Sequence, residues 1–125
     1  MTVLEADKAA IRQRLLAEEA RTVEQIELLD ERGREMQPPG EVAFSTTETL
    51  QDESMLAIER EKDLTLRRSL QGVLLHVRSA LLKLERGSYG ACDSCGQPIA
   101  PARLQVLPYS ALCITCQTKA ERRRS

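Results

Sequence analysis

Aromatic residues are almost missing from this sequence of 125 residues, which contains no Trp, one Phe and two Tyr. The length is one domain's worth, but without aromatic bulk such a chain does not fill a large globular interior. Burial must come instead from stripes of Leu, Ile and Val. The composition therefore favours a small helical protein with a limited core.

Long apolar runs are missing as well. Residues 1–7 contain no apolar signal core, and no stretch is long enough to span a membrane. We therefore expect a cytoplasmic protein in a reducing compartment, with no membrane partner.

Cysteine occurs at only four positions, which form two Cys-x-x-Cys pairs with seventeen residues between them: Cys92, Cys95, Cys113 and Cys116. Two intervening residues let both thiolates of a pair face one point, so two pairs can surround one ion tetrahedrally. The spacing predicts a single Zn²⁺ held by all four cysteines. Because four protein ligands leave no open coordination position, this zinc is expected to be structural.

Two other uses of these cysteines have less support. A redox dithiol needs a βαβ context, and the sequence lacks the alternating strand pattern that would supply it. Structural disulfides need an oxidising compartment, for which the sequence shows no export signal.

Charge is distributed unevenly, although its sum is only −1. Residues 1–36 carry nine acids and six bases, residues 37–64 seven and two, and residues 65–125 three and ten, so the net charges are −3, −5 and +7. The terminal run Arg122-Arg123-Arg124 fits a solvated tail as well as a binding patch. With a total near zero, direct DNA binding is not expected.

Two long segments have helical periodicity. Residues 4–36 contain no proline and carry apolar residues at roughly helical spacing, and Pro38-Pro39-Gly40 then stops the helix. In residues 50–86 the apolar residues are spaced 3, 4, 4 and 3 apart, as in a coiled-coil seam: Leu70, Val73, Val77, Leu81 and Leu84. Gly87 is expected to cap this second helix.

We predict an all-α-dominated fold. Residues 1–86 would form a long antiparallel coiled-coil hairpin with a tip loop at about 37–49, and residues 87–125 a C4 zinc finger with a short C-terminal helix. By the helical rise, both long helices would measure roughly 50 Å. A compact three- or four-helix bundle, broken near Gly33 or Gly72, is the alternative, although a glycine inside a helix costs only about 1 kcal/mol.

Details of the zinc module can be predicted as well. Gly96 should adopt a positive φ that turns backbone amides toward the sulfurs. The last helix should run from Cys113 to about Arg124. Three cations are candidates to offset the negative charge of a four-thiolate zinc site: Arg86, Arg103 and Lys119.

Acidic residues gather on and below the predicted tip of the hairpin. Catalytic carboxylates need a water-excluding cleft that shifts their pKa values apart, and an exposed tip offers none. We therefore do not expect an enzyme.

One motif extends well beyond the cysteines. It reads Leu84-Glu85-Arg86-Gly87-Ser88-Tyr89-Gly90-Ala91-Cys92-Asp93-Ser94-Cys95-Gly96-Gln97-Pro98-Ile99, then Arg103-Leu104, Pro108 and Leu112-Cys113-Ile114-Thr115-Cys116-Gln117. This combination of glycines, ligands, an Arg-Leu pair and a proline resembles the C4 zinc finger of the TraR/DksA family.

Members of this family bind bacterial RNA polymerase, insert a helical hairpin into its secondary channel and place acidic tip residues near the active centre. The resemblance implies the same partner, and transcription regulation as the function. Aligned without gaps from the zinc finger, the family's tip signature of two aspartates and an alanine falls on Thr49, Asp52 and Ser54. The implied tip acid is Asp52, with Glu48 or Glu53 in place of the missing second acid.

Some members of this family bind the alarmone ppGpp through basic residues at the junction of the hairpin and the zinc finger. The same alignment places His76, Leu107 and Gln117 at these positions, and none of them is a permanent cation. Binding of ppGpp is therefore not expected. His76 instead fits a half-buried place on the flank of the second helix, beside Val73 and Ala80.

Two other functions stay open. The hairpin could pair with another helical protein, or with itself, in an adaptor that has lost polymerase binding. A nucleic-acid-binding zinc ribbon could use Arg103, Lys119 and Arg122 to Arg124, although aromatic residues for base stacking are nearly absent.

Overall fold

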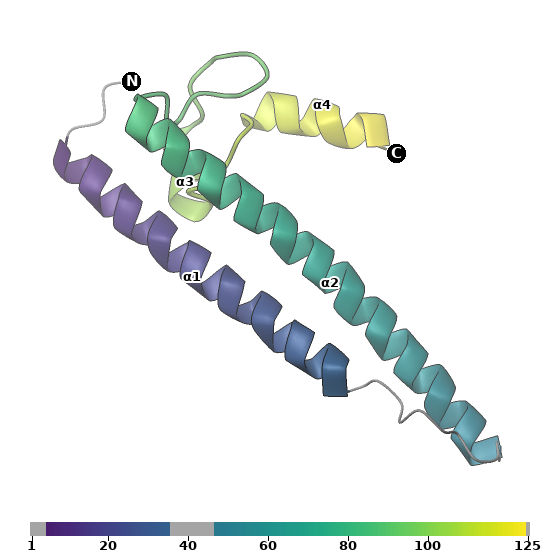
Figure 1. Ribbon diagram of the computed structural model, residues 1–125. Helices are drawn as coiled ribbons and strands as arrows, with labels where there is room; N and C mark the ends of the chain where they lie inside the picture. Colours follow the sequence, from purple (N-terminus) through teal and green to yellow (C-terminus); the bar gives the residue numbers. More distant parts are fainter. Residues whose placement is uncertain (1–4, 36–46, 125) are drawn as a thin grey trace.

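The computed structural model describes residues 5–35 and 47–124. Four helices follow one another: α1 (Glu5–Glu35), α2 (Thr47–Arg86), α3 (Pro101–Val106) and α4 (Ile114–Arg124). Helices α1 and α2 lie side by side in opposite directions, and the segment with α3 and α4 sits beside the C-terminal end of α2 (Figure 1). The described residues contain no strand, only an isolated bridge between Ala91 and Pro98. The predicted fold class, a helical hairpin with a small zinc-finger module, is confirmed.

The boundaries and lengths of the long helices differ from the expectation. Helix α2 begins at Thr47, so the predicted tip loop ran too far at its C-terminal end, and the first part of that loop lies outside the described residues. No proline or glycine interrupts residues 47–50, and Glu48 suits a first turn because the helix dipole favours negative charge there. The helices have 31 and 40 residues, about 46 and 60 Å by the helical rise, and are therefore unequal.

The hydrophobic core of the hairpin lies at its base, next to the zinc module. Its buried members are Leu15, Val77, Ala80 and Leu84, with Ile11, Val73 and Leu81 packed against them. The spacings of three, four and seven residues place the α2 members on one helix face, as the seam predicted. Both tyrosines, Tyr89 and Tyr109, pack on this cluster from the zinc module, so the scarce aromatic residues cover the junction.

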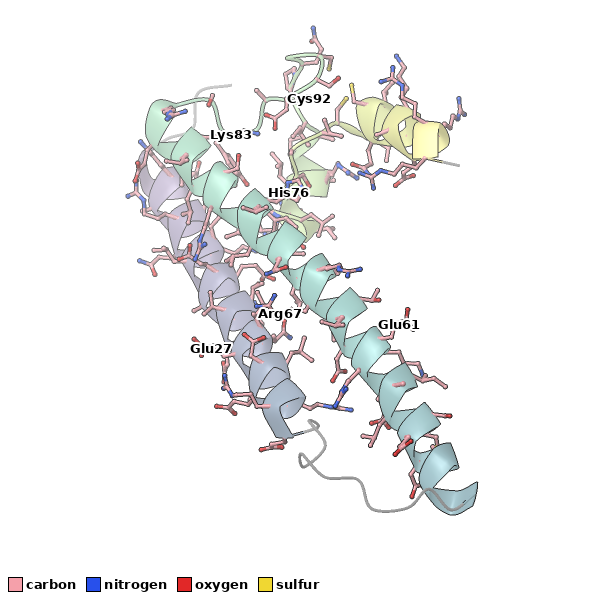
Figure 2. The ribbon with its side chains drawn as sticks, turned by 45° about the vertical axis from the view of Figure 1, so that its right-hand side comes forward. Glu27, Glu61, Arg67, His76, Lys83 and Cys92 are labelled. Atoms are coloured by element: carbon pink, nitrogen blue, oxygen red, sulfur yellow. The ribbon has the colours of Figure 1, made fainter. Side chains whose placement is uncertain are left out.

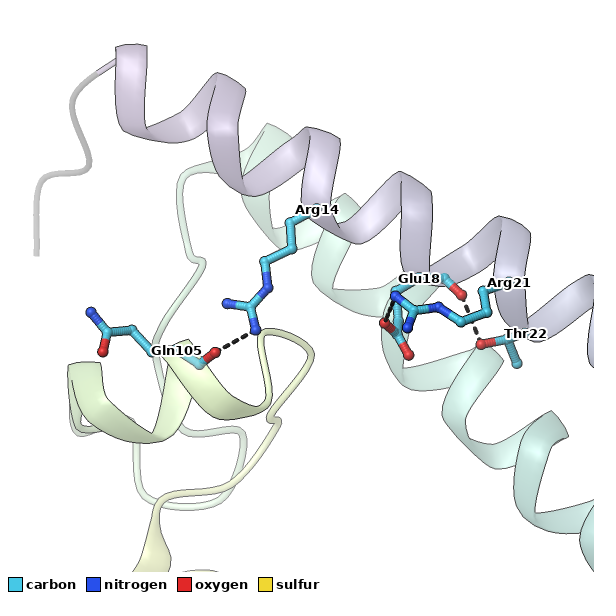
Figure 3. A network of polar contacts seen from close by, with 5 residues as sticks. All are labelled: Arg14, Glu18, Arg21, Thr22 and Gln105. Carbon is cyan, nitrogen blue, oxygen red and sulfur yellow. Dashed lines mark hydrogen bonds and ion pairs between the residues drawn. The ribbon is translucent and has the colours of Figure 1, made fainter.

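One polar residue shares this buried face. Thr22 of α1 is 2% exposed, and its hydroxyl donates to the carbonyl oxygen of Glu18 at 2.7 Å, while the Glu18 carboxylate accepts from Arg21 at 2.9 Å (Figure 3). A hydroxyl bonded one turn back within its own helix can be buried without an unmet hydrogen bond. The hydrophobic pattern therefore could not identify Thr22 as a core position.

Farther from the base, ion pairs between the helices accompany apolar residues that are only partly buried, such as Leu29 of α1 and Leu70 of α2. Arg67 reaches α1 from α2 (Figure 2), where its Nε donates to Asp30 Oδ1 at 2.7 Å. Arg32 Nε lies 3.1 Å from Asp63 Oδ2, an atom that is buried without a hydrogen bond. None of the described side chains at residues 52–70 is buried. Because partly exposed ion pairs contribute only about 0–1 kcal/mol each, this half of the hairpin is held less firmly than the base.

The location of the core predicts a sharp contrast between two neighbouring leucines. Leu15 is 0% exposed and Leu16 is 41% exposed. We expect Leu15→Ala to lower the free energy of unfolding by about 2–5 kcal/mol, because it leaves a cavity at the base. Leu16→Ala is the matched control and should cost about 1 kcal/mol or less. Urea unfolding of the zinc-loaded proteins measures both, and equal costs would contradict the assigned core.

A second prediction concerns the ion pair between Arg67 and Asp30. The hydrogen bond from Arg67 is the main cause that holds the pKa of the Asp30 carboxyl below its ordinary value. The pair therefore stabilises the hairpin above the pKa of the unfolded chain, and this contribution is lost as pH falls through the lowered folded pKa. In Arg67→Gln, we expect the pKa of Asp30 to rise in a carboxyl NMR titration. Arg68→Gln, at the next and exposed position, should leave it unchanged.

Candidate metal centre and hairpin tip

The four predicted zinc ligands come together from two separate turns. Cys92 and Cys95 lie in the turn that follows α2, Cys113 immediately precedes α4, and Cys116 is in its first turn. All four sulfurs lie within 4.8 Å of one another. Cys95 Sγ and Cys113 Sγ are 3.8 Å apart, which equals the edge, about 3.8 Å, of a tetrahedron with Zn–S bonds of about 2.3 Å. The donor set and its geometry fit one structural Zn²⁺, and the cysteines are not joined as disulfides.

Hydrogen bonds from backbone amides stabilise the thiolate form of one cysteine in the sulfur cluster. Hydrogen bonds from the amides of Cys113, then Cys95 and Ser94, lower the pKa of the Cys92 thiol to about 6. The pKa of Cys116 is raised instead, to about 12, first by its hydrogen bond with Cys113 and then by burial. The two shifts therefore have different causes: amide donors act on Cys92, and a neighbouring thiol together with burial acts on Cys116. Several thiolates this close to one another need a compensating positive charge. When bound, Zn²⁺ supplies this charge and keeps all four sulfurs deprotonated.

Glycines make the turns that bring the ligands together. Gly87 has φ 80°, and the amide of Ser88 donates to the Lys83 carbonyl at 2.9 Å, which ends α2 as predicted. Gly96 has φ 76°, and its amide donates to the Cys92 carbonyl at 3.0 Å. Both conformations are strained for residues with a Cβ atom.

Two polar contacts attach the zinc module to the hairpin. Arg14 of α1 donates to the backbone carbonyl of Gln105 at the end of α3 (Figure 3), and Lys83 of α2 forms an ion pair with Asp93 of the first knuckle. Figure 2 shows Lys83 and Cys92 at this same end of the molecule. Neither contact could be predicted from the sequence, because no local pattern indicates a partner 91 or 10 residues away.

A further hydrogen bond lies within the zinc module itself. The Tyr89 hydroxyl donates to the Pro108 carbonyl at 2.8 Å, and burial raises the pKa of Tyr89, which keeps this donor protonated. Arg103 Nε donates to the Leu112 carbonyl at 3.1 Å, so it braces the segment before Cys113. The short helix α3 was not predicted, although Pro101 at its first position is a typical helix start.

The predicted tip acids lie at the opposite end of the molecule from the cysteines. Asp52 and Glu53 are exposed on α2, and Glu48 belongs to the first turn of α2, with its side chain outside the described residues. Arg32 lies 3.6 Å from Glu59, only one turn before α1 ends, so Asp52 and Glu53 are on the part of α2 that extends past α1 (Figure 1).

None of the three positions aligned with the family's ppGpp-binding bases carries a permanent cation. His76 is exposed, so the expected half-buried place was wrong. A helix turns by about 100° per residue, and His76 therefore points away from the face that Val77 buries. Gln117 is held by its own helix, since its amide donates to the Glu121 carboxylate at 3.1 Å. Leu107 is 38% exposed.

Loss of the metal should have a local effect. We expect Cys113→Ser to abolish the one bound Zn²⁺ per chain and to unfold residues 87–124, because the binding energy of a structural zinc, about 10–16 kcal/mol, exceeds what so small a core supplies. The α1–α2 core contains no ligand, so most helicity should remain. Elemental analysis and amide NMR measure the two effects. Ser94→Ala, between the first two ligands, is the control, and a Cys113→Ser protein with native zinc-module signals would contradict the assignment.

Comparison with known proteins agrees with this geometry. Residues 87–122 match the prokaryotic dksA/traR C4-type zinc finger. The chain is 30% identical over 82 residues to general stress protein 16O of Bacillus subtilis, covering 66% of this chain and 50% of that protein. It is 32% identical over 74 residues to the RNA polymerase-binding transcription factor DksA of Caulobacter vibrioides, covering 59% of this chain and 52% of that protein. The chain thus spans about half the length of these relatives.

Solved structures extend the likeness to the hairpin. The transcription factor DksA2 from Pseudomonas aeruginosa superposes with a TM-score of 0.75 at 28% identity, over 96% of this chain and 87% of that one. An RNA polymerase binding protein and transcriptional regulator from Chlamydia trachomatis shares the fold, with a TM-score of 0.54 at 23% identity, over 96% of this chain and 93% of that one. With its four-cysteine site and its hairpin, the chain belongs to the DksA/TraR family of C4-type zinc finger proteins.

Proposed function

We propose that this protein binds bacterial RNA polymerase and regulates transcription without being an enzyme, by inserting its hairpin into the secondary channel. Relatives named as RNA polymerase-binding transcription factors support the partner. No helix in the described part of the chain is both long and apolar enough to cross a membrane.

The observation that carries the proposal is the position of two exposed acids at the far end of the rod. Within the acid-rich segment, Glu59 and Asp63 are paired with Arg32 of α1. Asp52 and Glu53 are exposed and lie beyond the end of α1. They are therefore the described carboxylates best placed to meet the metal-containing centre of the polymerase, with Asp52 as the principal tip acid and Glu48 or Glu53 as its support.

The zinc module has a supporting role in this proposal. It packs on the base of the hairpin through Tyr89 and Tyr109 and sets how the two helices leave the globular end. The positions aligned with ppGpp-binding bases offer no permanent cation, so regulation is proposed to be independent of ppGpp.

Binding can be tested with zinc-loaded protein and purified core polymerase. We expect a complex at micromolar concentration that a cleavage factor using the same channel displaces. If no complex forms under these conditions, RNA polymerase is not the partner. If a complex forms but the cleavage factor cannot displace it, the protein does not bind in the secondary channel.

The role of the tip is tested by Asp52→Ala combined with Glu53→Ala. Both side chains are exposed, so the fold should be unaffected, and polymerase binding should persist while the change in transcript yield is lost. Glu85→Ala, at the other end of the same helix, should behave as the wild type. If the double variant still alters transcription in a reconstituted initiation assay, the acids assigned to the tip are wrong.

A further inference from the structure

Helix α4 projects from the zinc module without packing on another helix. None of its side chains is buried, and no other helix in the described part of the chain packs against it. In both ribbon views it lies on the side of α2 that faces away from α1 (Figure 1, Figure 2). It is joined to the molecule through the zinc site, to which Cys113 and Cys116 contribute at its beginning. Its four cationic side chains are all exposed.

The charges of α4 are sorted by face. At about 100° per residue, Lys119 and Arg123 lie one turn apart on one face, with Arg122 beside them, and we call these three residues the basic face. The single acid of the helix, Glu121, lies on the opposite face, where its carboxylate accepts a hydrogen bond from Gln117. Arg122 has a further contact within the chain, whereas Lys119 and Arg123 have no acidic partner among the described residues.

Two local effects do not account for this face. The helix dipole favours cations in the last turn, which applies to Arg122, Arg123 and Arg124 but not to Lys119, which precedes that turn. A Zn²⁺ ion with four thiolates carries a formal charge of −2 at the beginning of α4. Arg123 is seven residues beyond Cys116, about 10 Å by the helical rise, which exceeds the Debye length of about 8 Å at physiological ionic strength. The outer end of α4 is therefore positive.

We propose that the basic face of α4 binds the phosphate backbone of duplex DNA without reading its sequence. The centre of a protein–protein interface is poor in charged residues and depends on apolar or aromatic anchors, whereas this face carries cations and no large apolar side chain. Arginine fits phosphate because its guanidinium donates two hydrogen bonds at once. Single strands are bound by stacking bases on aromatic side chains, but Tyr89 and Tyr109 pack on the hairpin core. Duplex DNA is the polyanion that remains.

The near-zero net charge, from which no direct DNA binding was expected, hides this separation of charge in space. Residues 47–63, in the half of α2 away from the zinc module, carry six acids and two bases. Within the zinc module, Asp93 is paired with Lys83, and Glu121 lies on the other face of α4. Few phosphate contacts and no base contacts predict weak binding, with a Kd of about 10⁻⁴–10⁻⁶ M at physiological salt. The site is independent of the proposed polymerase contact through Asp52.

Fluorescence anisotropy with a labelled DNA duplex tests the proposal on the zinc-loaded full chain. We expect binding at low salt, with a slope of log K against log salt between about −2 and −4, close to one per phosphate contact. Lys119→Gln combined with Arg123→Gln should weaken binding at least about tenfold and make the slope less steep by about two. Lys62→Gln combined with Arg68→Gln is the matched control, because it removes one Lys and one Arg from exposed positions on α2, and it should leave both quantities unchanged.

Competition experiments separate the occupants. An unlabelled duplex of different sequence should displace the labelled one equally well, and polyglutamate at the same concentration of charge should displace it far less well. Elemental analysis and amide NMR check that each variant keeps its zinc and its fold. The proposal is overturned if the wild type does not bind at low salt, if the control loses as much affinity as the α4 variant, or if a single strand binds more tightly than the duplex. Displacement by polyglutamate as efficient as by DNA would also overturn it, and would assign the face to an acidic protein surface.

Discussion

The packing of the zinc module on the base of the hairpin is the contact on which the rest of the molecule depends. Four cysteines from two turns surround one point, and the glycine turns that bring them there leave Tyr89 and Tyr109 against the core of α1 and α2. These two tyrosines are two of only three aromatic residues in the sequence, and both pack where the zinc module meets the hairpin. The metal site therefore acts structurally, because it fixes the end from which both long helices extend.

The stability of the hairpin falls along its length. At the base, Leu15, Val77 and Leu84 exclude water, whereas farther along Arg67 and Arg32 hold the helices through ion pairs. This gradient suits a rod whose far end must adapt to another surface, since regions with few buried contacts open at low free-energy cost. It also divides the acids of α2 into Glu59 and Asp63, which help to hold the hairpin, and Asp52 and Glu53, which do not contact α1.

Helix α2 therefore serves several purposes with one run of forty residues. One face supplies the core of the hairpin, its early turns carry the exposed acids Asp52 and Glu53, and Leu75 and Leu82 are exposed on another face. The net charge changes from −4 over residues 47–63 to +4 over residues 64–86, and several of these charges pair with α1 or with the zinc module.

By itself, the sequence determined the zinc ligands, the two long helices, the seam near Val77, the cap at Gly87 and the positive φ at Gly96, because each follows from a short local motif or from the spacing of such motifs. Only the tertiary structure decided the unequal helix lengths, the burial of Thr22, the exposure of His76 and the contacts of Arg14 and Lys83. These depend on which surfaces meet after folding, and a periodic pattern identifies an apolar face without identifying the element that covers it.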